Sequence, residues 1–248
     1  MEYQVLVFVI GLIIGSFLNV CIYRLPLGQS VVRPLSHCVQ CGHRLGVIDL
    51  LPVVSYLALQ GRCRHCGQAY SDRYLLVEVL TGLLFVWCYV VFGGSFLLIK
   101  ALVFTAFMIC ITYIDYDHRL ILDKVLLWLA AAGVIIEAAW PSLSIGSIVA
   151  GILTGGGVLL LIAIVSGGGM GMGDVKFALA LGVWLGLAQM LLLLFLSFLL
   201  GGVAGTVALA CGWKKRKDAI PFGPFMAIAA FFSLLYGQEI IAWYLALY

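Results

Sequence analysis

The chain has 248 residues, of which 64% are hydrophobic and 10% are charged, and its formal net charge is +3. Soluble domains are roughly 45–50% apolar and about 25% charged, so this composition excludes a water-soluble globule and, because disorder requires low hydrophobicity, a disordered chain. The small net charge gives no indication of nucleic-acid binding. The alternating segments of a membrane β-barrel are absent, so the sequence predicts an all-α polytopic membrane protein.

Apolar runs of the length that crosses a bilayer, about 17–25 residues, recur along the chain. We expect about eight transmembrane helices, at residues 4–23, 75–93, 96–114, 120–139, 145–166, 175–188, 189–211 and 222–246. The sixth run is short, about 21 Å as a helix, and only Ala188 and Gln189 separate it from the seventh. Aromatic belts occur at membrane interfaces, so we expect three tryptophans near the outer one: Trp140, Trp184 and Trp243.

Basic residues are distributed unevenly between the two sides of this arrangement. Thirteen of the fourteen lie in the loops on one side or in the span ends that border them: Arg24, Arg33, Arg44, Arg62, Arg64, Arg73, Arg119, Lys124, Lys176, Lys214, Lys215, Arg216 and Lys217. Lys100 is the exception. By the positive-inside rule the side that carries them is cytoplasmic, so we expect both termini to face outside. The cluster at 214–217 is expected to anchor this topology and to meet anionic lipid.

Residues 25–73 form the only sizeable hydrophilic segment, a small cytoplasmic insert. It holds two C-x-x-C pairs, Cys38 with Cys41 and Cys63 with Cys66, and two such pairs can close a tetrahedral zinc site. So small a segment needs a staple and the cytoplasm keeps thiols reduced, so we expect structural zinc, with redox chemistry or unliganded thiols as the alternatives. The neighbouring histidines are expected to be loop residues or hydrogen-bond donors rather than ligands: His37, His43 and His65.

Ionisable groups in membrane spans are costly, so each is a candidate for function. Asp115 ends the third expected span and Asp174 opens the sixth, so they lie at one membrane depth and can face each other. Two carboxyl groups at short range do not both ionise readily, so one keeps a proton while the other acts as a base on water. Such a pair hydrolyses amides without a serine or a metal, and the glycines before Asp174 would let a substrate backbone approach. Asp117 and Asp123 are expected to be solvated boundary charges.

Five groups of residues follow one another along most of the chain. They are Gly15-Ser16-Phe17-Leu18-Asn19-Val20 with Tyr23-Arg24-Leu25-Pro26, the four cysteines, Ser55-Tyr56-Leu57 with Gly61-Arg62-Cys63-Arg64 and Arg73-Tyr74 to Glu78, Gly171-Met172-Gly173-Asp174, and Ile220-Pro221-Phe222-Gly223-Pro224. In this order they resemble the bacterial type IV prepilin peptidases, which are bifunctional leader peptidases and N-methyltransferases. The fourth group is similar to the G-x-G-D signature of intramembrane aspartyl proteases. Two positions depart from the family pattern, where proline is usual: Val39 and Leu122.

The resemblance implies roles for particular residues. The catalytic pair would be Asp115 and Asp174, because Asp115 precedes Asp123 by the eight residues usual in the family. Binding of S-adenosylmethionine would involve Glu78 and Gly82, one helical turn apart. The alternative for Glu78 is an ion pair at the interface, with Arg73 or Arg62. Pro221 and Pro224 are expected only to begin the last helix.

The resemblance also implies an organisation and a reaction. The segments would be a first transmembrane helix (1–24), a four-cysteine, zinc-binding insert associated with methyl transfer (25–73) and a membrane-embedded aspartic peptidase domain (74–248). The expected substrates are prepilins or pseudopilins of pilus, secretion or DNA-uptake systems, cut after a glycine behind a short basic leader and then N-methylated. The expected cofactors are structural zinc and S-adenosylmethionine, with no metal for proteolysis. The expected location is the bacterial inner membrane, with the active site at the cytoplasmic face, lipid as a neighbour and no nucleic-acid partner.

The residues alone are also compatible with two other classes of function. In a transporter or assembly subunit, Asp115 and Asp174 would relay protons. In a scaffold, the zinc insert would hold a cytoplasmic partner. Transporters often show repeated halves, and neither the insert nor the glycine-rich segment has a counterpart elsewhere in the chain. A scaffold leaves Asp174 and its glycines without a role, so the enzyme is the favoured interpretation.

Overall fold

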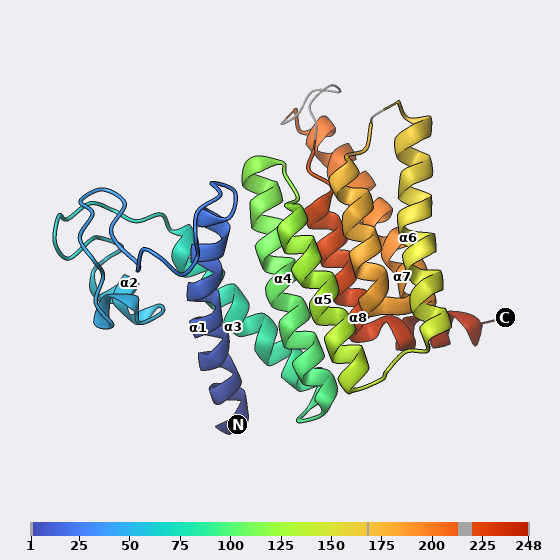
Figure 1. Cartoon of the computed structure of the whole chain (residues 1–248), viewed down its shortest axis with the longest axis horizontal. Coiled ribbons are helices and arrows are strands. Elements are labelled where there is room, and N and C mark those ends of the chain that lie inside the picture. Colours follow the sequence, from blue (N-terminus) through green and yellow to red (C-terminus); the bar gives the residue numbers. More distant parts are fainter. Residues whose placement is uncertain (1, 168, 213–219, 248) are drawn as a thin grey trace. The chain divides into compact units, whose positions relative to one another are not determined.

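The computed structural model describes residues 2–167, 169–212 and 220–247. This part of the chain consists of helices and loops, without a strand, and it confirms the predicted all-α class (Figure 1). The chain divides into two compact units, Met1–Cys110 and Ile111–Tyr248. The basic cluster at 214–217 lies outside the described residues, so its contact with lipid stays a prediction.

The first unit contains two helices of membrane length with the insert between them. α1 spans Glu2–Arg24 and α3 spans Arg73–Phe92, and the unit also holds the first part of α4 (Phe96–His118). The insert is mostly loop, with a 3₁₀ turn η1 at Ile48–Leu50 and a short helix α2 at Val54–Ala58 (Figure 1). So little regular structure agrees with the expectation that the insert needs a staple.

Glycine brings α1 and α3 into backbone contact. A Cβ atom on Gly11 would lie 2.6 Å from the Cα atom of Gly82, and one on Gly15 would lie 2.7 Å from the Cα atom of Glu78. Gly11 and Gly15 are four residues apart and share one face of α1, which is the small-xxx-small pattern by which helices approach closely in lipid. This contact places Glu78 directly against α1.

The second unit contains the end of α4 and four further helices. These are α5 (Asp123–Ala139), α6 (Ile145–Val165), α7 (Met172–Ala210) and α8 (Gly223–Leu245). α7 packs against each of the other three. Glycine again lies at a point of closest approach, because a Cβ atom on Gly182 of α7 would lie 2.5 Å from the backbone nitrogen of Ile152 on α6.

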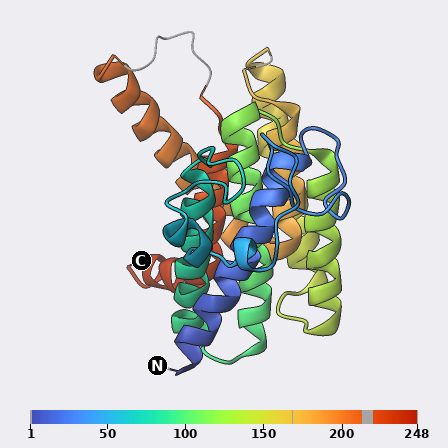
Figure 2. The same cartoon turned by 90° about the vertical axis from the view of Figure 1, so that its left-hand side faces the viewer.

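α7 is interrupted at Gly186, which has φ 64° and ψ −172°. Residues with a Cβ atom rarely adopt this conformation, so glycine is needed here. A Cβ atom on Gly151 would lie 2.6 Å from the carbonyl carbon of Gly186, so α6 packs directly on the interruption. Figure 2 shows the later part of α7, in orange, projecting from the neighbouring helices of its unit. The break predicted at Ala188 and Gln189 therefore exists, but it lies at Gly186.

Six of the described helices are long and apolar enough to cross a membrane: α1, α3, α4, α6, α7 and α8. α5 has 17 residues and is shorter, whereas α7 has 39 residues and contains two of the predicted spans. All eight predicted spans therefore coincide with helical segments. This agreement supports a multi-pass membrane protein.

Trp184 was expected near the outer membrane interface, but it is buried among helices. Its side chain is fully buried, and its Nε1–H group donates to the carbonyl oxygen of Leu129 on α5 at 2.9 Å. A Cβ atom on Gly133 would lie 2.6 Å from this nitrogen, so the glycine of α5 makes room for the indole. Trp140 and Trp243 are exposed. Trp184 is therefore a packing residue between α5 and α7.

The contact between α1 and α3 predicts that Gly11→Ala destabilises the protein. The added Cβ atom would meet backbone atoms, which cannot rotate away, and such overpacking costs about 1–3 kcal/mol. We expect a lower thermal unfolding midpoint in detergent. Gly157→Ala is the matched control, because a Cβ atom there meets no described atom within 4 Å and alanine favours a helix. Equal midpoints for the two variants would contradict the packing argument.

Candidate functional site

Asp115 and Asp174 lie together in the second unit. Asp115 occupies the last turn of α4 and is buried, with 6% of its surface exposed, and Asp174 occupies the first turn of α7. The two carboxyl groups are close enough to interact electrostatically. Two helix ends that are distant in the sequence thus bring the expected pair of carboxyl groups together.

The loop after α4 fits between the first turns of two other helices. Arg119 has φ 52°, and its N–H group donates to the carbonyl oxygen of Asp115 at 2.8 Å, which ends α4. Ile121 follows and is buried. Its side chain lies 3.2 Å from where a Cβ atom on Gly173 would be and 3.3 Å from where one on Gly223 would be. Glycine at the starts of α7 and α8 therefore makes room for this loop.

The two glycines before Asp174 have different surroundings. At Gly173 the missing side chain makes room for Ile121 of the same chain. At Gly171 a Cβ atom would lie 3.2 Å from Oδ2 of Asp174, so Gly171 borders the carboxyl group itself. Of the two, Gly171 is the one that leaves this carboxyl group approachable.

Other acidic residues of the second unit have different environments. Asp117 and Asp123 are exposed, and Asp123 forms an ion pair with Lys176 at 2.8 Å. Glu137 is buried, and its carboxylate accepts the N–H and hydroxyl groups of Ser142 at 2.9 and 2.6 Å. These contacts give Asp123 and Glu137 structural roles, as a surface ion pair and as a cap on the turn after α5.

The carboxyl pair can carry out acid–base chemistry on water. A pair that shares one proton offers a base and an acid at the same point. Oδ2 of Asp115 already accepts the N–H group of Gly223 at 3.1 Å, which orients this carboxyl group. The arrangement can therefore activate water against a carbonyl carbon and protonate the oxygen or the leaving amine.

The four cysteines of the insert come together in two copies of one turn. In each copy the first cysteine donates its N–H group to a carbonyl five residues later, and the glycine after the second cysteine donates back to the first. The four bonds, 2.8–2.9 Å long, are Cys38 to His43, Gly42 to Cys38, Cys63 to Gln68 and Gly67 to Cys63. Gly42 and Gly67 have φ 70° and 71°, which glycine adopts readily. The repeated pattern C-x-x-C-G therefore produces two equivalent knuckles.

The four sulfur atoms are arranged like the ligands of a metal ion. All Sγ atoms lie within 4.8 Å of one another, and those of Cys38 and Cys66 are 3.8 Å apart. Tetrahedral zinc, with Zn–S bonds of about 2.3 Å, holds its sulfurs at about this separation. The N–H groups of Cys66 and His65 lower the pKa of the Cys63 thiol to about 6, which favours the thiolate that binds metals. The cluster can therefore hold zinc.

The histidines beside the cysteines are engaged with other groups. The rings of His43 and His65 stack with centroids 4.0 Å apart. Nδ1 of His37 lies 3.0 Å from the carbonyl oxygen of Leu35. The group of described residues that could hold a metal ion consists of the four cysteines, so a non-ligand role for the histidines stays a prediction.

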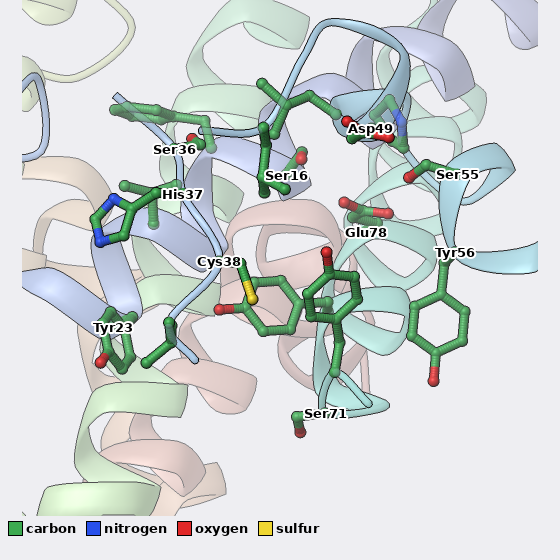
Figure 3. Close-up of a pocket in the computed structure, with 18 of the residues that line it drawn as sticks. Ser16, Tyr23, Ser36, His37, Cys38, Asp49, Ser55, Tyr56, Ser71 and Glu78 are labelled. Carbon is green, nitrogen blue, oxygen red and sulfur yellow. The ribbon is translucent and has the colours of Figure 1, made fainter. Parts of the chain in front are cut away.

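A pocket of about 720 Å³ lies in the first unit, lined by residues of α1, the insert and α3 (Figure 3). This volume is within the range of small-molecule sites, about 300–1,000 Å³. Figure 3 shows Glu78 between Ser16 of α1 and Ser55 of α2, with Cys38 of the cysteine cluster also in the wall. The wall is rich in aromatic rings: Phe17, Tyr23, Tyr56, Tyr70 and Tyr74.

Glu78 reaches this pocket, whereas Gly82 does not line it. Oε2 of Glu78 accepts the N–H group of Val53 at 2.8 Å, and the hydroxyl group of Ser16 also hydrogen-bonds the carboxyl group. Val53 has φ 62°, a strained value for a β-branched residue, so this hydrogen bond helps to hold the start of α2. Gly82 packs on α1, where its Cβ atom would lie 2.7 Å from the ring of Phe8.

Two residues in or beside this site were not expected from the sequence: Tyr70 in the pocket wall, and Val53, which donates its N–H group to Glu78. Tyr70 lines the pocket and hydrogen-bonds the sulfur of Cys63, so it connects the pocket with the cysteine cluster. Burial and the Cys63 sulfur raise the pKa of Tyr70. In the sequence Tyr70 follows Gly67 of the second knuckle by three residues, and this closeness to the cysteines could have indicated a contact with them. No such signal marked Val53, because valine disfavours the backbone conformation with positive φ that this residue adopts.

Two family sequence models match the chain. Residues 9–92 match the bacterial peptidase A24 N-terminal domain, and residues 102–206 match the type IV leader peptidase family. Together the two matches cover the cysteine insert, the pocket and both aspartates.

Several relatives are similar to this chain over nearly its whole length. A prepilin leader peptidase/N-methyltransferase of Pseudomonas putida is 38% identical, over 94% of this chain and 91% of its own length. The proteins of the same name from Aeromonas salmonicida (strain A449) and Bacillus subtilis (strain 168) are 34% and 33% identical, over 98% and 97% of this chain and 94% and 97% of their own lengths. No solved structure matches. On these matches, the chain belongs to the type IV leader peptidase family.

Proposed function

We propose that this chain is a bifunctional membrane enzyme. It cleaves the short basic leader of type IV prepilin-like proteins after a glycine, and it then N-methylates the amino terminus that cleavage exposes. Its relatives bear the name prepilin leader peptidase/N-methyltransferase over nearly the whole chain. The observation that carries the peptidase is that Asp115 and Asp174, at two helix ends, lie close enough to interact electrostatically.

Asp115 and Asp174 act as the catalytic pair in this proposal. The ionised carboxylate takes a proton from water while the water oxygen attacks the carbonyl carbon of the scissile glycine. The protonated carboxyl group gives its proton to the carbonyl oxygen. When the tetrahedral intermediate collapses, the first carboxyl group protonates the leaving amine and the second recovers its proton, so both return to their starting states. Carboxyl groups carry all of these proton transfers, so cleavage needs no metal.

The orientation follows from the charge distribution. Thirteen of the fourteen basic residues lie on one side of the predicted spans, in the loops or in the span ends that border them, and the positive-inside rule makes this side cytoplasmic. Asp115 and Asp174 belong to the same side, where a basic leader would stay while the apolar helix behind it enters the membrane. Both termini then face outside. We assign the peptidase to residues 74–248 and associate methyl transfer with the insert at 25–73, after the first transmembrane helix at 1–24.

Zinc is the ion that we assign to the cysteine cluster. Four thiolates complete a tetrahedral site and leave no open position, so the role is structural. The ligands are Cys38, Cys41, Cys63 and Cys66, from the two knuckles of the insert. Because the insert has only one 3₁₀ turn and one short helix, the ion would supply much of its folding free energy.

Methyl transfer takes place, in this proposal, at the pocket beside the cluster. S-adenosylmethionine would supply the methyl group there as a sulfonium cation. Aromatic faces and a carboxylate attract cations, and the pocket wall carries Glu78 with several tyrosines. Glu78 would hold the cationic donor. Gly82 would act through Glu78, because it lets α3 lie directly against α1.

The carboxyl pair predicts that Asp115→Asn and Asp174→Asn each strongly reduce the rate of cleavage. Loss of one acid–base group reduces a rate by about 100- to 10,000-fold. The assay is cleavage of a prepilin-like peptide, with a basic leader, glycine, phenylalanine and an apolar helix, followed by mass spectrometry. Asp117→Asn is the matched control, because this residue is exposed on the same helix end, and it should cleave normally. Cleavage by either catalytic variant at the wild-type rate would refute the assignment and favour a relay or scaffold.

The cysteine cluster predicts one zinc ion per chain. Cys38→Ser or Cys66→Ser should lose the ion and unfold the insert, since zinc binding contributes about 10–16 kcal/mol to small zinc domains. Metal content by mass spectrometry and proteolysis of the insert measure both effects. Cys211→Ser is the control, since Cys211 lies outside the cluster. A wild-type protein that is folded, active and free of zinc would contradict this prediction.

Glu78 predicts a selective effect on methyl transfer. Glu78→Gln keeps an oxygen that can accept the N–H group of Val53, but it removes the negative charge. A hydrogen bond to a charged group contributes about 1.5–3 kcal/mol. We expect the KM for S-adenosylmethionine to rise about tenfold or more, with cleavage unchanged. Addition of a methyl group to a pre-cleaved peptide is the assay. Glu239→Gln, an exposed residue, is the control, and an unaltered KM in Glu78→Gln would remove Glu78 from the site.

A further inference from the structure

The segment at 220–224 does more than begin the last helix. Gly223 is the first residue of α8 and is buried, and its N–H group donates to Oδ2 of Asp115 at 3.1 Å. Pro224 follows and has no N–H group, so Gly223 is the donor of this pair. The amino end of α8 thus reaches a carboxyl group on α4 that is 108 positions away in the sequence.

Only a residue without a side chain fits at position 223. A Cβ atom there would lie 2.6 Å from Oδ2 and 3.1 Å from Cγ of Asp115, and 3.3 Å from Cδ1 of Ile121. Separations under 3.0 Å do not occur for real Cβ atoms, so some group would have to move. Ile121 is buried and lies against Gly173 on its other side. The group with freedom to move is therefore the carboxyl group of Asp115.

We propose that Gly223 is a positioning residue of the peptidase site. Its N–H group holds Oδ2 of Asp115, and its missing side chain lets the carboxyl group and the start of α8 meet. Oδ2 is then committed to α8, which leaves Oδ1 for the water molecule and for Asp174. The inference rests on the proposed peptidase function of Asp115.

The helix end suits this role physically. The first N–H groups of a helix have no partner within the helix, and the positive end of the helix dipole lies there. A carboxylate is the side chain that gains most from such a donor. A backbone N–H donor also has no side-chain rotamers, so holding it in place costs no side-chain conformational entropy. Small displacements of a reacting group cost large factors in rate, about 100-fold for 1 Å.

Kinetics of Gly223→Ala test the positioning role. We expect its kcat for cleavage of the prepilin-like peptide to fall about 100-fold, with KM unchanged and with methyl transfer to a pre-cleaved peptide intact. Gly201→Ala is the matched control, because its Cβ atom would make only an ordinary contact, 3.4 Å, with Phe222 of the same segment. A wild-type kcat, or a raised KM with unchanged kcat, would overturn the proposal.

Stability in two backgrounds tests the contact independently of activity. Gly223→Ala should lower the thermal unfolding midpoint of the wild-type chain but not that of Asp115→Ala, in which the clashing carboxyl group is absent. If Gly223→Ala alone does not fold, recovery of folding in the double variant supports the proposal. Equal loss of stability in both backgrounds, or failure to fold in both, overturns it.

The proposed catalytic role of Asp115 and the positioning role of Gly223 are tested separately. Cleavage that survives Asp115→Asn would refute the proposed peptidase mechanism, and it would leave the stability comparison unaffected. Normal loss of cleavage in Asp115→Asn together with a fully active Gly223→Ala would refute only the role of Gly223.

Discussion

In a bilayer, apolar side chains gain little by leaving lipid for a helix interface, so helices associate through close packing and hydrogen bonds. Glycine supplies this close packing in both units of the protein. Gly11 and Gly82 bring α1 and α3 into backbone contact in the first unit, and Gly151 and Gly182 do the same for α6 and α7 in the second. Because such contacts join backbone to backbone, they leave little freedom in how the paired helices lie.

The carboxyl pair depends on the same constraint. Asp115 lies at the end of one helix and Asp174 at the start of another, and the loop after α4 enters between the starts of α7 and α8 beside them. Glycine at 173 and 223 makes that entry possible, and Ile121 fills the space. The proposed active site is thus an assembly of helix termini, where unpaired backbone N–H groups can serve a carboxylate.

Much of this could be predicted because the signals are local. Hydropathy alone placed eight spans that coincide with helical segments, since each must satisfy its own backbone hydrogen bonds in lipid. The C-x-x-C-G pattern, repeated at Cys38 and Cys63, encodes its own turn, so the cluster could be anticipated. Other features depended on partners: Trp184 is buried because Gly133 faces it, and Val53 holds a strained conformation where Glu78 accepts its N–H group.

The sequence by itself determined the helical class, the positions of the apolar helical segments, the four-cysteine cluster and the two aspartates as candidates, because each follows from composition or from spacing over a few residues. The tertiary structure alone decided that Gly182 and Gly223 serve contacts with other helices, that α7 breaks at Gly186, and that Glu78 reaches a pocket while Gly82 packs on α1. A glycine carries no side chain that could indicate its partner. Its role becomes visible only when the atoms that surround the position of the missing Cβ atom are known.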